Sequence, residues 1–162
     1  MSVLIVAAHP DDELLGCGGT IARIAATDPV DIVILGEGLS SRLERRDAVD
    51  PGALRRLHGD AARVAKLLGA RSVEVAGLPD NRFDELAMLD VVKRVEAYVA
   101  RHRPSAIYTH HPGDLNIDHG VTFRAVMTAT RPVAEHPVRD IYTFEVASST
   151  EWAFQQIAPA FC

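Results

Sequence analysis

The sequence predicts one α/β domain with a Rossmann-like, three-layer sandwich fold, and three observations support this. Short apolar runs alternate with longer stretches of helical periodicity, which is typical of a mostly parallel sheet covered by helices on both faces. The 162 residues are enough for one core, so residues 1–162 are taken as a single domain. Polar side chains gather directly after two of the apolar runs. Right-handed crossovers then favour the strand order 3-2-1-4-5.

The apolar runs expected to form strands are 3–7, 31–35, 72–76, 105–109 and 139–146. Helical spacing predicts helices over 12–26, 53–69, 85–102 and 117–130. Leu14, Leu89 and Ile117 are expected on the buried sides of three of these helices. Several glycines near the start of the first helix, Gly16 among them, predict close packing there. The segment 36–52 is too long for a simple connector and is expected to cover a site.

Composition excludes several classes of protein. The chain is 48% apolar and 24% charged, with a net charge of −5, as in an ordinary soluble domain. Its densest basic stretch, 42–47, alternates with acidic residues, so no nucleic-acid partner is expected. No run is long enough to span a membrane, and no signal peptide is visible. Cys17 and Cys162 do not make a disulfide framework, so a cytoplasmic location is expected.

Four ionisable side chains follow the first apolar run: His9, Asp11, Asp12 and Glu13. A turn with an acidic helix cap needs only one Asp here, so the cluster favours metal binding or acid–base chemistry over a purely structural turn. The glycines that follow also suggest a dinucleotide-binding turn. Their spacing does not fit that motif, however, and an acidic cluster would repel a pyrophosphate.

A second polar concentration, residues 110–119, follows the fourth expected strand. The order 3-2-1-4-5 places strand 1 beside strand 4, at the switch point where a crevice opens. The topology therefore predicts that His9, Asp11 and Asp12 meet Asp118 and His119, about a hundred positions along the chain.

Two imidazoles and one carboxylate can bind zinc and leave a fourth position for water. His9 and Asp12, three residues apart at a helix start, can both point into the crevice, where His119 would join them. Asp11 would lie beside the bound water and accept its proton, which is metal-assisted hydrolysis. The same ligands accept Fe²⁺, so the native metal stays open.

The stretch AHPDDE after strand 1 and the late Asp118-His119 pair resemble the PIG-L/LmbE-like zinc-dependent N-acetylglucosaminyl deacetylases, over most of residues 3–151. The resemblance implies removal of an acyl group, usually acetyl, from an amino sugar or its conjugate. By it, zinc is bound by His9, Asp12 and His119, Asp11 is the general base, and Asp118 orients or tunes the neighbouring base chemistry. Positions matching the sugar pocket of relatives, together with a histidine of the second motif, are the substrate-binding candidates: Arg42, Asp80, Asn81, Arg82 and His111.

One departure from that family concerns the catalytic acid. Many members read His-x-Asp-His in the second motif, and the first His helps to stabilise the oxyanion, whereas this chain has Asn116. An Asn amide can donate a hydrogen bond to an oxyanion but cannot supply a proton. Three alternatives stay open. Zinc and Asn116 are enough to stabilise the oxyanion, or His110 or His111 acts as the acid. In the third, protonated Asp11 returns its proton to the leaving amine. The last alternative is preferred because it needs no further residue.

A second departure concerns the end of the chain. Relatives generally continue with further helices, and this domain is expected to lack them. Trp152, Phe154, Ile157 and Phe161 have the character of buried residues. A fragment, a natural truncation, and burial against a second copy in a homo-oligomer are the alternatives left open.

The expected function is that of a zinc-dependent hydrolase that removes acetyl from a small N-acetylated amino sugar or sugar conjugate. A metal-dependent amidase acting on another sugar-linked amide would use the same residues. A catalytically silent metal- or sugar-binding module is the alternative from another class, which Asn116 and the short C-terminus keep open. A phosphoesterase is disfavoured because no second carboxylate-rich metal site is visible.

Overall fold

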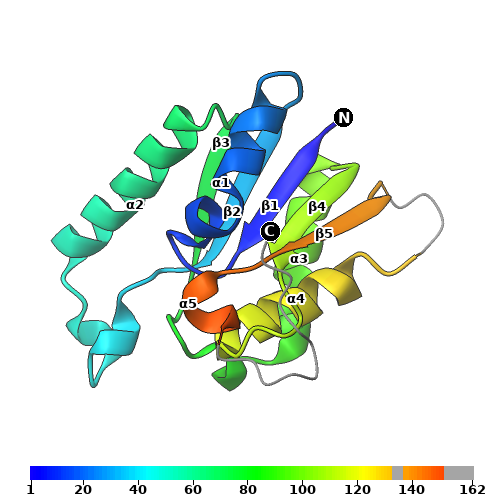
Figure 1. The fold of residues 1–162 in the computed structure, drawn as a ribbon. Coiled ribbons are helices and arrows are strands. Elements are labelled where there is room, and N and C mark those ends of the chain that lie inside the picture. Colours follow the sequence, from blue (N-terminus) through cyan, green and yellow to red (C-terminus); the bar gives the residue numbers. More distant parts are fainter. Residues whose placement is uncertain (133–136, 152–162) are drawn as a thin grey trace.

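A computed structural model describes residues 1–132 and 137–151 (Figure 1). Its five strands form one sheet in the order β3-β2-β1-β4-β5, and each neighbouring pair is parallel. This confirms the predicted fold class and strand order. The strands are β1 (Val3–Ala7), β2 (Val30–Gly36), β3 (Ser72–Leu78), β4 (Ala106–His110) and β5 (Asp140–Phe144). The apolar C-terminal residues from Trp152 onward lie outside the described residues.

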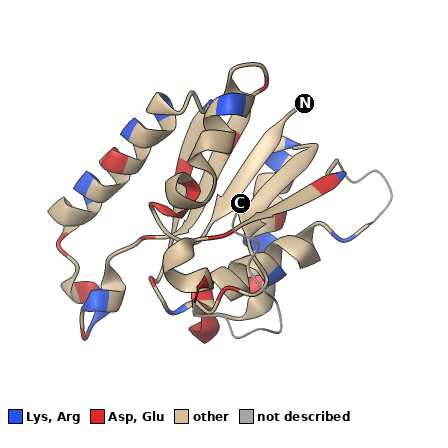
Figure 2. Cartoon of the chain, viewed as in Figure 1, with Lys and Arg blue, Asp and Glu red and all other residues tan. Residues whose placement is uncertain are grey.

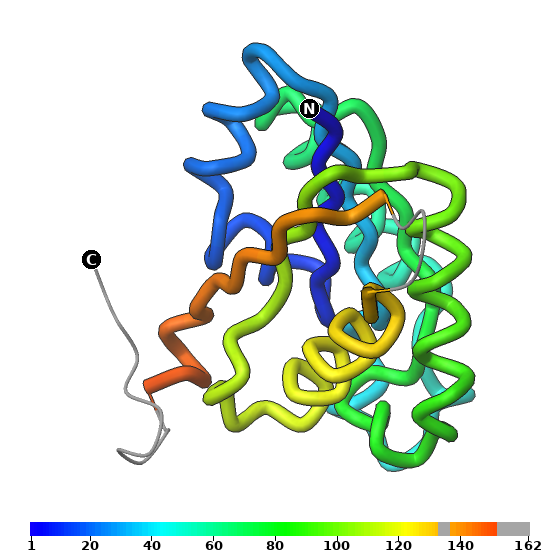
Figure 3. The backbone as a smooth tube through the Cα atoms, turned by 90° about the vertical axis from the view of Figure 1, so that its right-hand side faces the viewer, coloured from blue at the N-terminus to red at the C-terminus, as the bar shows by residue number. Residues whose placement is uncertain are grey.

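Helices cover both faces of the sheet. Figures 1 and 3 show α1 (Asp12–Ala25) on one side of the strands and α3 (Met88–His102) with α4 (Ile117–Ala129) on the other. The helix α2 (Pro51–Leu67) packs beside α1, and a short helix α5 (Ala147–Thr150) follows β5. Three 3₁₀ turns complete the described elements: Ser40–Arg42, Arg46–Ala48 and Phe83–Glu85.

The central strand β1 contributes to two separate cores because its side chains alternate between the faces of the sheet. Val3 and Ile5 pack with α1 and α2, whereas Leu4 and Val6 pack with α3 and α4. All five residues of β1 are buried, as expected for a strand covered on both faces. β1 pairs with β2 on one side and with β4 on the other, so the loops after β1 and β4 emerge side by side.

The helix α2 begins at Pro51, two residues before the predicted start. The carboxylate of Asp50 accepts hydrogen bonds from the backbone N–H groups of Gly52 and Ala53, at 2.8 and 3.0 Å. Asp50 is therefore a helix cap, and Pro51 occupies a first-turn position where its missing N–H costs nothing. The predicted long loop is shorter as a result, and it contains two of the 3₁₀ turns.

Three predicted buried side chains are exposed instead. Leu14, Leu89 and Ile117 are 43%, 62% and 54% exposed, so this prediction was wrong. Each lies in the first turn of its helix, at the carboxyl edge of the sheet, where the core ends. Side chains beyond the edge of the sheet have less of the core to pack against, and periodicity alone does not show where the strands stop.

The surface of the described residues carries mixed charge. Figure 2 shows mostly basic positions with one acidic position along α2, and charges of both signs in the loop before it. No helix among the described residues combines the length and apolar character needed to cross a lipid bilayer.

The glycine-rich first turns of α1 make room for β5, which confirms the close packing predicted there. A Cβ atom on Gly16 would lie 2.3 Å from Cδ2 of Phe144, a buried residue at the end of β5. A Cβ on Gly19 would meet nothing within 4 Å. Gly16 and Gly19 therefore allow a comparison between a crowded and an open position in the same helix.

We expect Gly16→Ala to lower the free energy of unfolding by about 1–3 kcal/mol, because Phe144 or α1 must shift to admit the methyl group. Gly19→Ala should instead raise it by about 0.5–1 kcal/mol, since Ala loses less conformational entropy in a helix. Urea denaturation of the two variants and the wild type measures both effects. Equal stability of the two variants would contradict this packing.

Candidate metal centre

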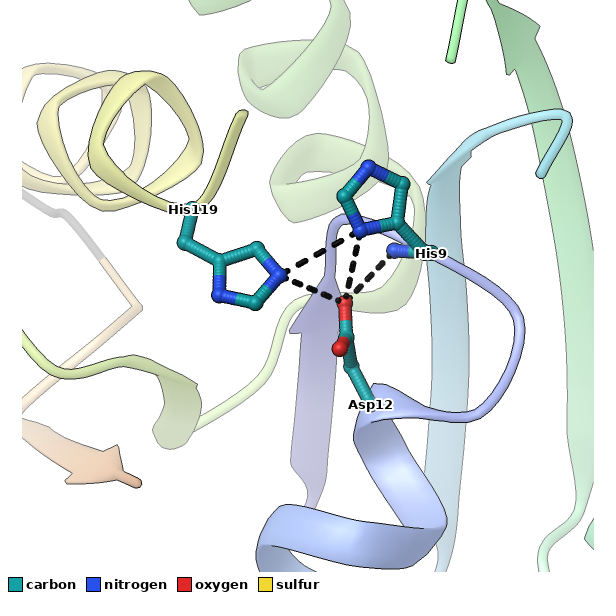
Figure 4. Close-up of side chains that lie close together, drawn as sticks. All are labelled: His9, Asp12 and His119. Carbon is teal, nitrogen blue, oxygen red and sulfur yellow. Dashed lines mark hydrogen bonds and ion pairs between the residues drawn. The ribbon is translucent and has the colours of Figure 1, made fainter. Parts of the chain in front are cut away.

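Three donor atoms from the segments that follow β1 and β4 lie close together in a triangle (Figure 4). His9 follows β1, Asp12 is the first residue of α1, and His119 lies in the first turn of α4. The distance is 3.3 Å from His9 Nδ1 to Asp12 Oδ2 and 3.2 Å from His119 Nε2 to the same oxygen. His119 Nε2 lies 3.3 Å from His9 Nδ1. The chain therefore brings together the three residues that the sequence singles out as metal ligands.

This triangle fits a zinc ion. Bonds of about 2.0–2.1 Å at tetrahedral angles separate neighbouring donor atoms by about 3.3–3.4 Å. The three edges of the triangle measure 3.2–3.3 Å, and both imidazoles and the carboxylate are donors that zinc and iron(II) accept. The described residues of this chain can thus hold one metal ion with three protein ligands.

A second carboxylate lies on the far nitrogen of each imidazole. His9 Nε2 is 3.0 Å from Asp118 Oδ2, and His119 Nδ1 is 2.9 Å from Asp114 Oδ2. When the rings are neutral, as metal binding requires, each of these nitrogens donates its proton outward, and the lone pairs of His9 Nδ1 and His119 Nε2 then point at the centre of the triangle. Carboxylates in this position orient the metal-binding rings and make them better ligands.

Asp118 also fixes the turn after β3. Its carboxylate, 0% exposed, accepts hydrogen bonds from the backbone N–H groups of Asn81 (2.7 Å) and Phe83 (2.9 Å). Asp118 thus binds both the His9 ring and the backbone of this turn. Asp11 is not among its hydrogen-bond partners in the described part of the chain.

Asp114 is a site residue that the sequence reasoning missed. Besides His119, its Oδ2 accepts hydrogen bonds from Ser149 (2.8 Å) and Thr150 (3.0 Å), which belong to α5. The available signal was chemical, because a metal-binding imidazole needs an acceptor for its second nitrogen. Asp114 lies between two motif residues of the second polar stretch and could have been assigned that task.

Without a metal, the cluster strongly favours charged imidazoles. Burial opposes protonation of His9, but hydrogen bonds with Asp118 and Asp12 outweigh it and raise its pKa to about 10. Burial likewise opposes protonation of His119, and hydrogen bonds with Asp114 and Asp12 raise its pKa to about 9. Burial raises the pKa of Asp12, but the hydrogen bonds from the two imidazoles outweigh it and hold that pKa far below its usual range.

Asp11 lies next to the triangle on a strained backbone, with φ at 150° and ψ at −26°. The residue is exposed and lines the cavity in front of the ligands. Partial burial, followed by the charge of Asp12, raises the pKa of Asp11 above its usual value. A carboxylate with a raised pKa is a stronger base, which suits proton transfer near neutral pH.

A cavity of about 440 Å³ opens in front of the triangle. Four of the remaining predicted site residues line it, namely Arg42, Asp80, Asn81 and Asn116. Two predicted substrate-binding residues do not. Arg82 extends towards Glu85 (3.5 Å), and His111 lines a separate groove of about 740 Å³ beside Phe144.

Asp80 is buried, and much of its carboxylate is already engaged. Its Oδ1 lies 3.3 Å from His9 Nε2, and its Oδ2 accepts hydrogen bonds from the backbone N–H and the hydroxyl of Ser41. This carboxylate therefore braces His9 and joins the loop after β2 to the site.

Asn116 caps α4 and is one of the residues that line the cavity. Its side-chain oxygen accepts hydrogen bonds from the N–H groups of Asp118 (2.9 Å) and His119 (3.4 Å). The amide orientation is therefore fixed, with one N–H donated to Asn81 Oδ1 at 3.1 Å. The second N–H of that amide is left for a ligand.

Neither of the two candidate acid histidines of the second motif lines the main cavity. His110 is 0% exposed, and burial lowers its pKa to about 3, so it is neutral at pH 7. His111 Nδ1 accepts a hydrogen bond from the backbone N–H of Gly113 at 3.0 Å.

The geometry predicts which substitutions remove the metal. His119→Ala should abolish zinc binding, and Asp114→Asn should weaken it about 10- to 100-fold by loosening His119. His102→Ala, at the far end of α3, is the control and should keep wild-type affinity. Metal content after dialysis and calorimetric titration with zinc measure this. Full zinc binding by His119→Ala would exclude this centre.

Metal binding should also release protons. With pKa values of about 10 and 9, His9 and His119 are both protonated at pH 7 in the metal-free protein, yet only neutral imidazoles bind zinc. We expect release of about two protons per zinc at pH 7, and tighter binding as pH rises towards 9. Calorimetry in two buffers of different ionisation enthalpy measures the number. Release of no protons would contradict the imidazole–carboxylate pairing.

Several known proteins resemble this chain. A deacetylase of unassigned substrate from Escherichia coli, YaiS, is 28% identical over 82% of this chain and 70% of its own length. The 1D-myo-inositol 2-acetamido-2-deoxy-α-D-glucopyranoside deacetylase of Actinosynnema mirum is 42% identical over 50% of this chain. A probable N-acetyl-α-D-glucosaminyl L-malate deacetylase of Bacillus cereus is 27% identical over 84% of this chain. The chain spans only 28% and 64% of the last two relatives.

Solved structures share the fold. The N,N′-diacetylchitobiose deacetylase of Pyrococcus horikoshii matches with a TM-score of 0.69 and 21% identity, over 80% of this chain and 49% of its own. GalB, the 4-carboxy-2-hydroxymuconate hydratase of Pseudomonas putida, matches with a TM-score of 0.65 and 27% identity, over 80% of this chain and 55% of its own. The sequence model of the PIG-L family, described as GlcNAc-PI de-N-acetylase, matches residues 4–130. That match covers both polar motifs and most of the sheet, and the chain belongs to the PIG-L family.

Proposed function

We propose that the protein is a zinc-dependent N-deacetylase acting on an N-acetylated amino sugar or sugar conjugate. One observation carries the proposal: the donor triangle of His9, Asp12 and His119 shares a cavity with Asp11, whose pKa is raised. A metal-binding triad beside a free carboxylate is the set of groups that amide hydrolysis by water requires. The names of the relatives support the class of substrate.

His9, Asp12 and His119 would hold the zinc ion, which would supply a Lewis acid for the acyl carbonyl and for the attacking water. The Asp11 carboxylate accepts a proton from that water as its oxygen bonds to the acyl carbon. The second N–H of Asn116 donates a hydrogen bond to the carbonyl oxygen while negative charge develops there.

Asp11 then serves as the acid. The proton that it accepted passes to the amide nitrogen as the C–N bond breaks, which gives acetic acid and a free amine. The acid then passes its remaining water proton to the amine, so that acetate and an ammonium group leave. Neither His110 nor His111 lines the cavity, which favours this use of Asp11 over a histidine acid. The proton balance closes with one residue and one water.

Polar groups opposite the metal centre suit a sugar. Arg42, Ser41 and Asn81 line the cavity and can bind hydroxyl groups, while Asp80 holds Ser41 and His9 in place. The volume of about 440 Å³ is enough for a monosaccharide with an attached group. Arg42 would suit a conjugate that carries an oxygen-rich or anionic substituent.

Other reactions can use the same residues. An amidase acting on a different sugar-linked amide shares every group named above. The 27% identity with GalB brings a second candidate, hydration of an unsaturated acid, which also adds water to a substrate but releases no acetate. A silent binding module would bind the metal and a sugar without turnover.

Acetate release from a panel of N-acetylglucosamine conjugates tests the proposal. Wild type should show turnover that depends on zinc, and Asp11→Asn should lower kcat by about 10²- to 10⁴-fold because its amide cannot accept the proton. Asp90→Asn, at an exposed position near the start of α3 and outside the cavity lining, is the matched control and should retain full activity. Both variants should bind zinc like wild type.

Equal acetate release by Asp11→Asn and wild type would rule out Asp11 as the base. Sugar binding without any turnover would identify a binding module. Consumption of an unsaturated acid without acetate release would favour the hydratase.

A further inference from the structure

Asp11 holds a helix-cap position without using its side chain as a cap. It precedes the first residue of α1, where an Asp normally accepts hydrogen bonds from the first N–H groups of the helix. The Asp11 carboxylate makes no such bond. Its backbone is also strained, with φ at 150°, a value that L-residues rarely adopt. Something other than capping must therefore hold this residue in place.

Glu13 supplies that constraint. This side chain is 2% exposed, and its Oε2 accepts a hydrogen bond from the backbone N–H of Asp11 at 3.1 Å. The contact resembles the return half of a capping box, but Glu13 is the second helical residue and not the third, as that motif requires. The same Asp11 N–H also lies 3.0 Å from the carbonyl oxygen of His9. A buried carboxylate thus forms a direct hydrogen bond with the strained peptide.

Packing restrains the turn from the other side. A Cβ on Gly38 would lie 2.7 Å from Cδ of Pro10, so the loop after β2 presses against the residue before Asp11. Glu13 itself lines a small cavity of about 130 Å³ between α1 and α2, beside Leu57 and Ala61. Strained backbone persists only where its surroundings determine it. Besides the packing of Gly38 and backbone hydrogen bonds to His9 and to the first turn of α1, Glu13 is the side chain that binds the Asp11 peptide.

We propose that Glu13 is the positioning residue for Asp11: its buried carboxylate holds the strained Asp11 peptide so that the Asp11 side chain stays free and faces the cavity. The role is geometric and depends on an acceptor oxygen at the end of the side chain. Its catalytic consequence rests on the proposed function, in which Asp11 transfers protons. Misplacing such a group by about 1 Å can cost about 10²-fold in rate.

Two substitutions distinguish the hydrogen-bond acceptor of the Glu13 side chain from its negative charge. Glu13→Gln keeps an oxygen acceptor at the same distance, whereas Glu13→Leu removes it and suits the apolar side chains nearby. Glu13→Met serves as a second apolar variant if Glu13→Leu does not fold. The readouts are zinc stoichiometry, kcat and KM for acetate release, and the three-bond HN–Hα coupling of Asp11, which reports φ and needs no activity.

We expect Glu13→Gln to keep the wild-type Asp11 coupling and kcat. Glu13→Leu should shift the coupling and lower kcat about 10- to 100-fold, with KM and zinc content unchanged. An unshifted coupling in Glu13→Leu, or an equal loss of kcat in both variants, would overturn the proposal. So would a shifted coupling with full kcat. If the wild type releases no acetate from any substrate, the deacetylase proposal fails, and the coupling alone then decides whether Glu13 positions Asp11.

Discussion

A buried hydrogen bond between the ends of two strands joins the halves of the metal centre. Pairing of β1 with β4 extends to Ile5, and beyond it the backbone N–H of Ala8 donates to His110 Nε2 at 2.8 Å. The His110 ring stacks on His119 with 3.9 Å between centroids, and its Nε2 lies 3.5 Å from Asp12 Oδ2. His110 must be neutral to accept this bond, and complete burial keeps it so. His110, which does not line the cavity, thus aligns ligands from both segments.

Much of this arrangement could be predicted from the sequence. Alternating patterns indicate a parallel sheet, and the strand order 3-2-1-4-5 makes neighbours of strands 1 and 4. That rule alone brings His9 and Asp12 to His119, because loops after adjacent parallel strands open at the same edge. Topology and residue type agree here, and each supports the other.

The rest depends on details that patterns do not carry. Asp114 binds a ring nitrogen of His119, and a ring nitrogen of His110 accepts the N–H of Ala8. Hydrogen bonds of this kind leave no periodic signal in the sequence. His111 differs from His110 by one position, yet successive residues at a strand end face opposite ways, so it enters another groove. Likewise, a single cap residue, Asp50, sets the start of α2 within the segment predicted to be a loop.

Charge balance shows how the ligand cluster can exchange protons for a divalent metal ion. The inner protons of His9 and His119 point at Asp12, and these two protons carry the charge that a divalent ion would bring. Exchanging two protons for one M²⁺ leaves the net charge of the buried cluster unchanged. The outer hydrogen bonds to Asp118 and Asp114 use the other ring nitrogens, so they persist through the exchange.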